Sequence, residues 1–265
     1  MFYITGDTHA DFRRFNKENF PEQVDMTKDD YVIICGDFGG VWSKEEDKNE
    51  RYWLDWLENR PFTALFVDGN HENFDRLYSM PVEEWNGGKI HRLRPSVIHL
   101  MRGQVFNIDG VSFFTFGGAR SHDIQGGILD RTRPTFKEEK AYAYAWGLPY
   151  RINHESWWKE EMPSDAEMEE GLSNLAKHGN KVDFILTHDA PTHIIKLIDK
   201  NFDLDKLNTY LDDIMTNVEF KHWIFGHHHI NQNISPKFIC LYEQISELKV
   251  QREPVKNYEE IFKEM

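Results

Sequence analysis

The segment FYITGDTHA, residues 2–10, passes from four aromatic or β-branched residues directly into Gly6, Asp7 and His9. A short run of this kind predicts a strand that is buried on both faces, as strands of a parallel sheet are. A stretch with helical character, residues 12–20, follows it, and strands and helices continue to alternate up to residue 80. This alternation predicts βαβ units and therefore an α/β fold.

Six further apolar runs have the length and composition of strands. They are YVIIC (31–35), TALFV (63–67), VSFFTF (111–116), VDFILT (182–187), HWIF (222–225) and FICLYEQI (238–245). Helices are predicted over residues 44–60, 71–80 and 164–179, and the last of these opens with Ser164 as its N-cap and closes at Gly179. We therefore expect strand-helix units first and a second half that is richer in strands.

Two regions depart from this pattern. Residues 119–160 begin with ARSHDIQGGILDRTRPTF, whose Gly, Pro and Asp content predicts an inserted loop that acts as a lid or binding loop. Residues 247–265 are charged, and we expect a C-terminal tail with one short helix there. A single domain is then predicted over residues 1–246.

The chain is acidic overall, with a formal net charge of −14, which disfavours non-specific binding to nucleic acid or anionic membranes. Residues 89–151 differ, because ten Lys or Arg against five Asp or Glu give them a net charge of +5. This segment is either a solvated basic face or the side from which an anionic substrate approaches. No apolar run approaches the roughly 20 residues that span a bilayer, so we expect a soluble, cytoplasmic protein without a membrane partner.

Polar residues end five of the predicted strands. The strand-end residues are Asp7 and His9, then Asp37, then Asp68, Asn70, His71 and Glu72, then His188 and Asp189, and finally His227, His228 and His229. Each motif alone fits an ordinary turn or loop, but the carboxyl ends of strands in an open α/β sheet are where ligands bind. Five such ends together predict one shared site.

The residue types at these strand ends indicate which ligand the site takes. Carboxylate, amide and imidazole ligands without thiolate suit Mn²⁺, Fe or Zn²⁺ better than a structural zinc site. Seven of these strand-end residues are candidate ligands, which is more than one ion needs. The sequence therefore predicts two ions that share a carboxylate.

The ordered series Asp-x-His, Gly-Asp, Gly-Asn-His-Glu, His and Gly-His-x-His resembles the calcineurin-like metallophosphoesterases, specifically their bacterial and phage members. The resemblance covers residues 1 to about 245. It implies an α/β sandwich of two mixed β-sheets flanked by helices, in agreement with the alternation of strands and helices.

The resemblance also implies roles for the strand-end residues. One divalent metal ion would be held by Asp7, His9, Asp37 and His229, and a second by Asp37, Asn70, His188 and His227. Mn²⁺ is the first candidate, with Fe or Zn²⁺ as alternatives. His71 would lie beside the substrate phosphate as general acid or transition-state stabiliser. A hydroxide bridging the two ions would attack a phosphomonoester or phosphodiester.

The triplet of histidines needs a separate interpretation. Side chains two apart in an extended segment share a face, so His227 and His229 are expected to point together at the metal ions while His228 points away. For Glu72 we expect a supporting role, either orienting a ligand or capping the following helix.

Departures from the family pattern bear on the substrate. The protein serine/threonine phosphatases carry a phosphate-binding arginine after the second strand, whereas this chain has GDFGGVW at residues 36–42. Arg120 and His122 are candidates to replace that contact, with an ordinary loop as the alternative. Arg131, Arg133 and the pair Trp157 and Trp158 are further candidates for the pocket, although a core or surface role is favoured for them.

Three other functions remain open. A nuclease or cyclic-nucleotide phosphodiesterase would have the same fold, with nucleic acid entering only as a substrate. A non-catalytic protein that binds a phosphorylated ligand is disfavoured because every expected metal ligand is present. A metal-dependent amidohydrolase is disfavoured because those enzymes open with His-x-His.

Overall fold

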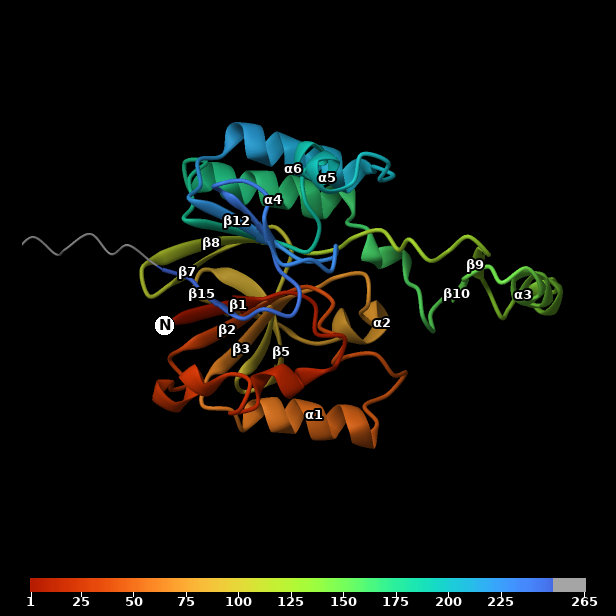
Figure 1. Ribbon diagram of the computed structural model, residues 1–265, viewed down its shortest axis with the longest axis horizontal. Helices are drawn as coiled ribbons and strands as arrows, with labels where there is room; N and C mark the ends of the chain where they lie inside the picture. The colour runs from red at the N-terminus through yellow and green to blue at the C-terminus, as the bar shows by residue number, and fades with distance from the viewer. Residues whose placement is uncertain (250–265) are drawn as a thin grey trace, which may run out of the picture.

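The structure, a computed structural model that describes residues 1–249, consists of two β-sheets packed face to face with helices on their outer faces (Figure 1). The strand order is β15-β1-β2-β3-β6-β5-β4 in one sheet and β13-β14-β12-β11-β8-β7 in the other. Both sheets are mixed, because their central strands are parallel and their edge strands antiparallel. This arrangement confirms the predicted α/β sandwich.

The first sheet contains β1 (Phe2–Thr5), β2 (Tyr31–Cys35), β3 (Thr63–Val67), β4 (Val82–Trp85), β5 (Gly88–Arg94), β6 (Val97–Leu100) and β15 (Ser246–Glu247). The second contains β7 (Gln104–Ile108), β8 (Val111–Phe116), β11 (Phe184–Thr187), β12 (His222–Phe225), β13 (Gln232–Asn233) and β14 (Phe238–Cys240). A separate pair joins β9 (Ile128–Leu129) to β10 (Arg151–Ile152). The candidate ligands follow β1, β2 and β3 in the first sheet and β11 and β12 in the second. Within each sheet these strands are parallel to one another, so their carboxyl ends can share one edge of the sandwich.

The α-helices are α1 (Lys48–Glu58), α2 (Phe74–Leu77), α3 (Phe136–Ala145), α4 (Asp165–Lys177), α5 (Thr192–Ile198) and α6 (Lys206–Asn217). Three 3₁₀ turns occupy Phe12–Phe15, Pro21–Asp25 and Lys159–Glu161. The predicted N-cap of α4 is confirmed, since Ser164 and Glu167 form a reciprocal capping box. Among the described residues, every helix is too short or too polar to cross a membrane.

Three apolar clusters hold these layers together. The inner faces of the two sheets meet in one cluster that includes Ile4, Ile33 and Leu186. The cluster beneath α4 to α6 lies on the second sheet, and the cluster beneath α1 lies on the first (Figure 1). Because the alternate residues of the central strands enter two clusters, these strands are buried on both faces, as their continuous apolar runs predict.

Several predicted elements are shorter than expected. Within residues 12–20 only Phe12–Phe15 are helical, as a 3₁₀ turn instead of an α-helix, because the Asn16 side chain accepts hydrogen bonds from the backbone N–H groups of Glu18 and Asn19. Such local bonds compete with the helix. The helix expected over 71–80 is reduced to α2, and the strand expected over 238–245 to β14.

The strands β4 to β7 were not predicted from the sequence. Polar or charged residues interrupt their apolar positions, as in GKIHRLR of β5 and QVFNI of β7, so no long continuous apolar run marks them. Most of β4 is exposed at the edge of its sheet.

Residues 119–160 project from the sandwich and contain β9, α3, β10 and most of the 3₁₀ turn at Lys159–Glu161 (Figure 1). The segment is therefore more ordered than the long loop expected from its composition. Its helix α3 buries only Ala143, which explains why no amphipathic pattern revealed it. Of the predicted tail, β15 pairs with β1, whereas the expected short helix falls on residues 250–265, outside the described residues.

Candidate metal centre and active site

The loops after β1, β2, β3, β11 and β12 converge at one edge of the sandwich. Their side chains form three overlapping groups in which the potential ligand atoms all lie within 4.8 Å of one another, namely Asp7, His9 and His229; His9, Asp37 and His71; and Asp37, His188 and His227. Asn70 joins the third group, because its Oδ1 lies 3.3 Å from Nε2 of His188. All seven predicted ligands, together with His71, are thus brought into one cluster.

Asp37 occupies the centre of this cluster. Its Oδ1 lies 3.3 Å from Nε2 of His188, whereas its Oδ2 faces the opposite group at 3.8 Å from Nε2 of His9. The backbone N–H of His71 donates to Oδ1 at 2.8 Å and holds the carboxylate in this orientation. The two oxygens of one buried carboxylate therefore face two different sets of imidazoles, which is the arrangement that a bridging ligand requires.

The group of Asp7, His9 and His229 has the polar atoms of a cation site. Oδ2 of Asp7 is buried and accepts no hydrogen bond from any residue in 1–249, although Nε2 of His229 lies 3.1 Å away. The Nε2 atoms of His9 and His229 lie 3.1 Å apart. Two nitrogens that are each about 2.1 Å from one metal ion at a right angle would lie about 3 Å apart. An orphaned carboxylate oxygen beside two facing imidazole nitrogens fits a divalent cation.

Left-handed backbone conformations aim several of these side chains. His9, Asp37, His227 and His229 have φ angles of 45°, 42°, 63° and 50°. Non-glycine residues with positive φ are uncommon and concentrate at functional sites. The prediction that the His227–His229 segment is extended is therefore wrong: His227 and His229 reach the cluster through left-handed turns.

Two glycines let the loops approach one another at the cluster. A Cβ atom on Gly36 would lie 2.0 Å from Nδ1 of His188, and one on Gly69 would lie 2.1 Å from Oδ1 of Asp37. Gly36 also has a φ of +90°, which other residues rarely adopt. Backbone at these positions therefore fills the space that any side chain would need.

Burial and the two aspartates set the protonation of the histidines. Burial lowers the pKa of His188, but the carboxylates of Asp37 and Asp7 oppose it and raise that pKa to about 10. Burial lowers the pKa of His227 to about 3, so its imidazole is neutral at pH 7. The negative potential that holds a proton on His188 is the same potential that attracts a cation, since a bound metal ion displaces ligand protons.

His71 lies at the rim of the cluster. Its Nε2 is 4.0 Å from Oδ2 of Asp37, and its ring stacks on Trp42 with centroids 5.8 Å apart. Burial lowers the pKa of His71, and the positive charge of Arg151 adds to this effect while Asp37 opposes it. The side chain is thus turned toward the cluster and partly open to solvent.

Arg151, from β10 in the projecting segment, was not predicted as a site residue. Its Nη2 lies 3.3 Å from Nε2 of His71, and its Nε donates to Oδ1 of Asp123 at 2.9 Å. The Arg151 side chain is 15% exposed. Nothing in the local sequence YRINH marks this arginine, because the fold of the whole 119–160 segment brings it to the site.

The two predicted substrate contacts, Arg120 and His122, occupy different positions. Nε2 of His122 lies 3.1 Å from Nε2 of His227, so this exposed histidine adjoins the second candidate metal group. Arg120 is partly buried and lies near His122. Loss of solvation lowers the pKa of His122, and the positive charge of Arg120 lowers it further. Neither residue contacts His71 in the described hydrogen bonds. The arginine that lies beside His71 is Arg151 instead.

Ser121, between these two residues, supports a candidate ligand. Nδ2 of Asn70 donates to Oγ of Ser121 at 3.3 Å, which leaves Oδ1 of Asn70 facing His188. Ser121 in turn donates to the buried carboxylate of Glu161 at 2.6 Å. Apart from the run FGGARSHD, no local motif indicated that Ser121 has this supporting role.

His228 and Glu72 stabilise the loops that carry the candidate ligands. Nε2 of His228 lies 3.2 Å from Oδ1 of the buried Asp189, and the imidazole is 6% exposed. Oε1 of Glu72 accepts from the N–H of Phe38 at 2.7 Å, next to Asp37. The cap of α2 is Asn73, so Glu72 does not have the capping role.

The remaining pocket candidates have structural positions. Trp158 is buried and donates to Asp75 at 2.7 Å, and Trp157 is partly buried. Arg131 and Arg133 are exposed, and Arg131 pairs with Glu155.

The sequence profile of the calcineurin-like phosphoesterase family matches residues 1–231. Lariat debranching enzyme A of Xenopus laevis is 25% identical over 154 residues, which cover 53% of this chain and 28% of that protein. Lariat debranching enzyme of Drosophila melanogaster is 21% identical over 253 residues, which cover 85% of this chain and 42% of that protein. The matches therefore span less than half the length of each relative. Because the family match covers most of the chain and all five strand-end loops, the chain belongs to the calcineurin-like phosphoesterase family, which confirms the predicted class of hydrolases acting on phosphoester bonds.

Proposed function

We propose that the chain hydrolyses phosphoester bonds with two divalent cations held at the strand-end cluster. The observation that carries this proposal is the position of Asp37, whose two carboxylate oxygens face separate histidine groups. A single-metal site would have no use for a second group of ligands on the far side of that carboxylate.

The donor set supports the assignment of ligands. Asp7, His9 and His229 would hold one cation, Asn70, His188 and His227 the other, and Asp37 would bridge them. Oxygen and imidazole donors without thiolate suit Mn²⁺ first, with Fe or Zn²⁺ as alternatives. Bound divalent cations would lower the pKa of water and neutralise charge on phosphoryl oxygens.

His71 and Arg151 would act on the substrate itself. Arg151 carries a permanent charge and donors in a fork that suits a phosphoryl group, and the contact with Nε2 of His71 places both at one rim of the cluster. A phosphate bound there would offset the effect of Arg151 on the pKa of His71. Nε2 of His71 would then donate a proton to the leaving oxygen, or a hydrogen bond to the charge that develops on it.

A second candidate is the hydrolysis of a phosphodiester in nucleic acid. The two relatives named as lariat debranching enzymes favour it, as does the basic composition of residues 89–151. Several of these basic side chains are neutralised, however, since Lys89 pairs with Glu170 and Arg102 with Asp68. A small phosphoester therefore remains the first candidate.

The decisive experiment measures metal content and turnover together. The purified chain is loaded with Mn²⁺ and assayed on p-nitrophenyl phosphate and on bis-p-nitrophenyl phosphate. We expect two equivalents of metal and hydrolysis of at least one ester, and the ratio of the two rates separates monoesterase from diesterase.

The variant His71→Ala tests the division of roles in the same assay. It should retain both equivalents of metal and lose about 100-fold to 10,000-fold in turnover, the usual contribution of general acid–base catalysis. His193→Ala, which removes an exposed histidine on α5, is the matched control. Absence of bound metal and of hydrolysis in the parent chain would overturn the proposed function, and loss of metal in His71→Ala would overturn the role of His71.

A further inference from the structure

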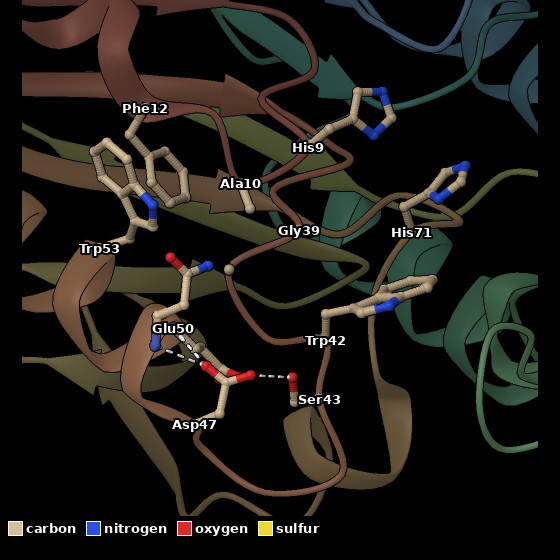
Figure 2. A pocket seen from close by; sticks show the side chains of 12 residues that line it. His9, Ala10, Phe12, Gly39, Trp42, Ser43, Asp47, Glu50, Trp53 and His71 are labelled. Atoms are coloured by element: carbon tan, nitrogen blue, oxygen red, sulfur yellow. Dashed lines mark hydrogen bonds between the residues drawn. The ribbon is translucent and has the colours of Figure 1, made fainter.

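A cavity of about 290 Å³ opens directly beside His9 and His71 and extends from them toward Asp47 (Figure 2). Its volume is near the lower end of the roughly 300–1,000 Å³ typical of small-molecule sites. None of the seven candidate metal ligands except His9 lines it. The cavity thus adjoins His71, the proposed proton donor, but is separate from most of the candidate metal ligands.

Aromatic side chains form the two opposing walls of the cavity. Phe12 and Trp53 lie on one side, with ring centroids 6.1 Å apart, and Trp42 lies on the other side below His71 (Figure 2). Trp42 is fixed by its stacking on His71 and by an edge-on contact with Trp158 at 5.6 Å. Rigid aromatic walls favour a flat apolar group, because such a group gains stacking contacts at little entropic cost.

The far end of the cavity is polar and negatively charged. Asp47, the N-cap of α1, accepts hydrogen bonds from the N–H groups of Asn49 and Glu50 and from the hydroxyl of Ser43 at 2.7 Å. These bonds lower the pKa of Asp47, so its carboxylate is ionised at neutral pH. An anionic end repels a second phosphate and favours a group that carries N–H donors.

We infer that this cavity receives the leaving group of the substrate, and that the group is a planar heteroaromatic ring with amino donors, the chemistry of an amino-bearing nucleobase. The inference rests on the proposed function, because His71 would protonate the leaving oxygen and also lines the cavity. A group attached to that oxygen would extend between Trp42 and Trp53 toward Asp47. The substrate class is then a nucleotide ester rather than a sugar or protein phosphoester.

The first test compares substrates that differ only by the ring. AMP and ribose 5-phosphate share the same leaving alkoxide, and their methyl esters serve the same purpose for a diesterase. With Mn²⁺ present, we expect kcat/KM to favour the adenine-bearing substrate by roughly tenfold or more, the range of a base stacked on an aromatic side chain. In Trp53→Ala that ratio should fall toward one.

Trp56→Ala is the matched control, since Trp56 lies on the same helix next to Trp53 but does not line the cavity. It should preserve the ratio. The second test compares CMP with UMP, whose rings differ in an amino donor and a carbonyl acceptor, or the corresponding methyl esters. CMP should be preferred, and Asp47→Asn, which retains a helix-capping side chain, should reduce that preference.

The outcomes separate the two proposals. Hydrolysis of bis-p-nitrophenyl phosphate without any preference for the adenine-bearing substrate would overturn the cavity assignment and leave the phosphoesterase standing. A preference that Trp53→Ala leaves intact would also overturn it. Failure to hydrolyse any of these esters with Mn²⁺ bound would instead overturn the proposed function.

Discussion

The strand-end loops and the projecting segment 119–160 contribute to the same site, but their side chains differ in how deeply they are buried. In the loops, the side chains of Asp7, Asp37 and His188 are at most 2% exposed and are surrounded by the two sheets. In the segment, α3 leaves its aromatic side chains open, with Tyr144 84% exposed. The loops thus present a fixed set of candidate ligands, whereas the segment brings Arg151 to the rim on a separate small unit.

From this difference we expect the two regions to have separate tasks. Ligands for metal ions must keep their geometry within a few tenths of an ångström, which buried loops between packed sheets can provide. Contacts to substrates vary more among related proteins and commonly lie on loops carried by a rigid scaffold. We therefore expect changes in the strand-end loops to abolish metal binding and changes in the segment to alter substrate use.

The largest expected effect is that of Asp37→Asn in the loop region. Asparagine keeps the size of the side chain but removes its charge and replaces one oxygen by an amide nitrogen that cannot coordinate a cation. Bound metal should fall below one equivalent and turnover by more than about 100-fold, since even residues behind the ligands contribute 10-fold to 100-fold in affinity. Elemental analysis of dialysed protein measures the metal, with the exposed Asp213→Asn as control.

The outcome of Asp37→Asn tests the comparison directly. Two equivalents of metal in this variant would show that the two histidine groups do not depend on a shared carboxylate.

The second effect concerns the segment. Arg151→Ala should retain both metal ions and lower kcat/KM by about 100-fold, as expected when a donor to developing charge is lost. Arg151→Lys should recover only part of the loss, because an ammonium group lacks the planar fork. Steady-state kinetics on the Mn²⁺-loaded protein provide the measurement.

Arg131→Ala is the control for Arg151, because Arg131 is an exposed arginine of the same segment that pairs with Glu155. Equal losses in the Arg131 and Arg151 variants would mean that the segment acts through its stability and not through one contact.

The third effect compares one glycine from each region. Gly36→Ala and Gly147→Ala both place alanine at a positive φ, but a Cβ on Gly147 meets nothing within 4 Å, whereas one on Gly36 meets His188. We expect about 1 kcal/mol of destabilisation from the backbone in Gly147→Ala and at least 2–3 kcal/mol in Gly36→Ala. Thermal unfolding would then show a melting temperature lower by about 2–4 °C per kcal/mol. Similar melting temperatures would argue against the tight packing of the loops.

The smallest expected effect on function is that of His228→Ala. Its loss leaves Asp189 bonded to the N–H of Ala190 and to Asn208, so the loop should hold its shape. We expect both metal ions to remain bound and turnover to change less than about threefold, with a loss of about 1.5–3 kcal/mol in stability for one hydrogen bond to a charged group. Chemical denaturation and elemental analysis measure these quantities, and loss of either metal would contradict the separation of His228 from its neighbours.

The α/β class and the convergence of the strand-end residues could be predicted from local signals in the sequence, whereas the sandwich of two sheets was implied by the family resemblance. Continuous apolar runs mark strands buried on both faces, and an apolar run that stops at Gly-Asp or Gly-His marks a carboxyl end. The assignment of individual residues to two metal ions remains a prediction that the variants above can test.

Other features depended on contacts between distant residues. Arg151 meets His71 across 80 positions of sequence, and Ser121 meets Asn70 across 51. The strand β5, which lies between β6 and the edge strand β4, is formed by a run interrupted by charges, and α3 has no apolar face. Neither periodicity nor local motif can report such features, because tertiary packing decides them.

The tight glycine packing also restricts how this protein could be redesigned. Any side chain at Gly36 or Gly69 would displace His188 or Asp37, so we expect mutant libraries that randomise the residues beside the candidate ligands to consist mainly of members with a distorted cluster. Useful diversity for an engineer lies instead in residues 119–160 and in the aromatic walls at Trp42 and Trp53. A search for new substrates should therefore vary the rim and keep the strand-end loops constant.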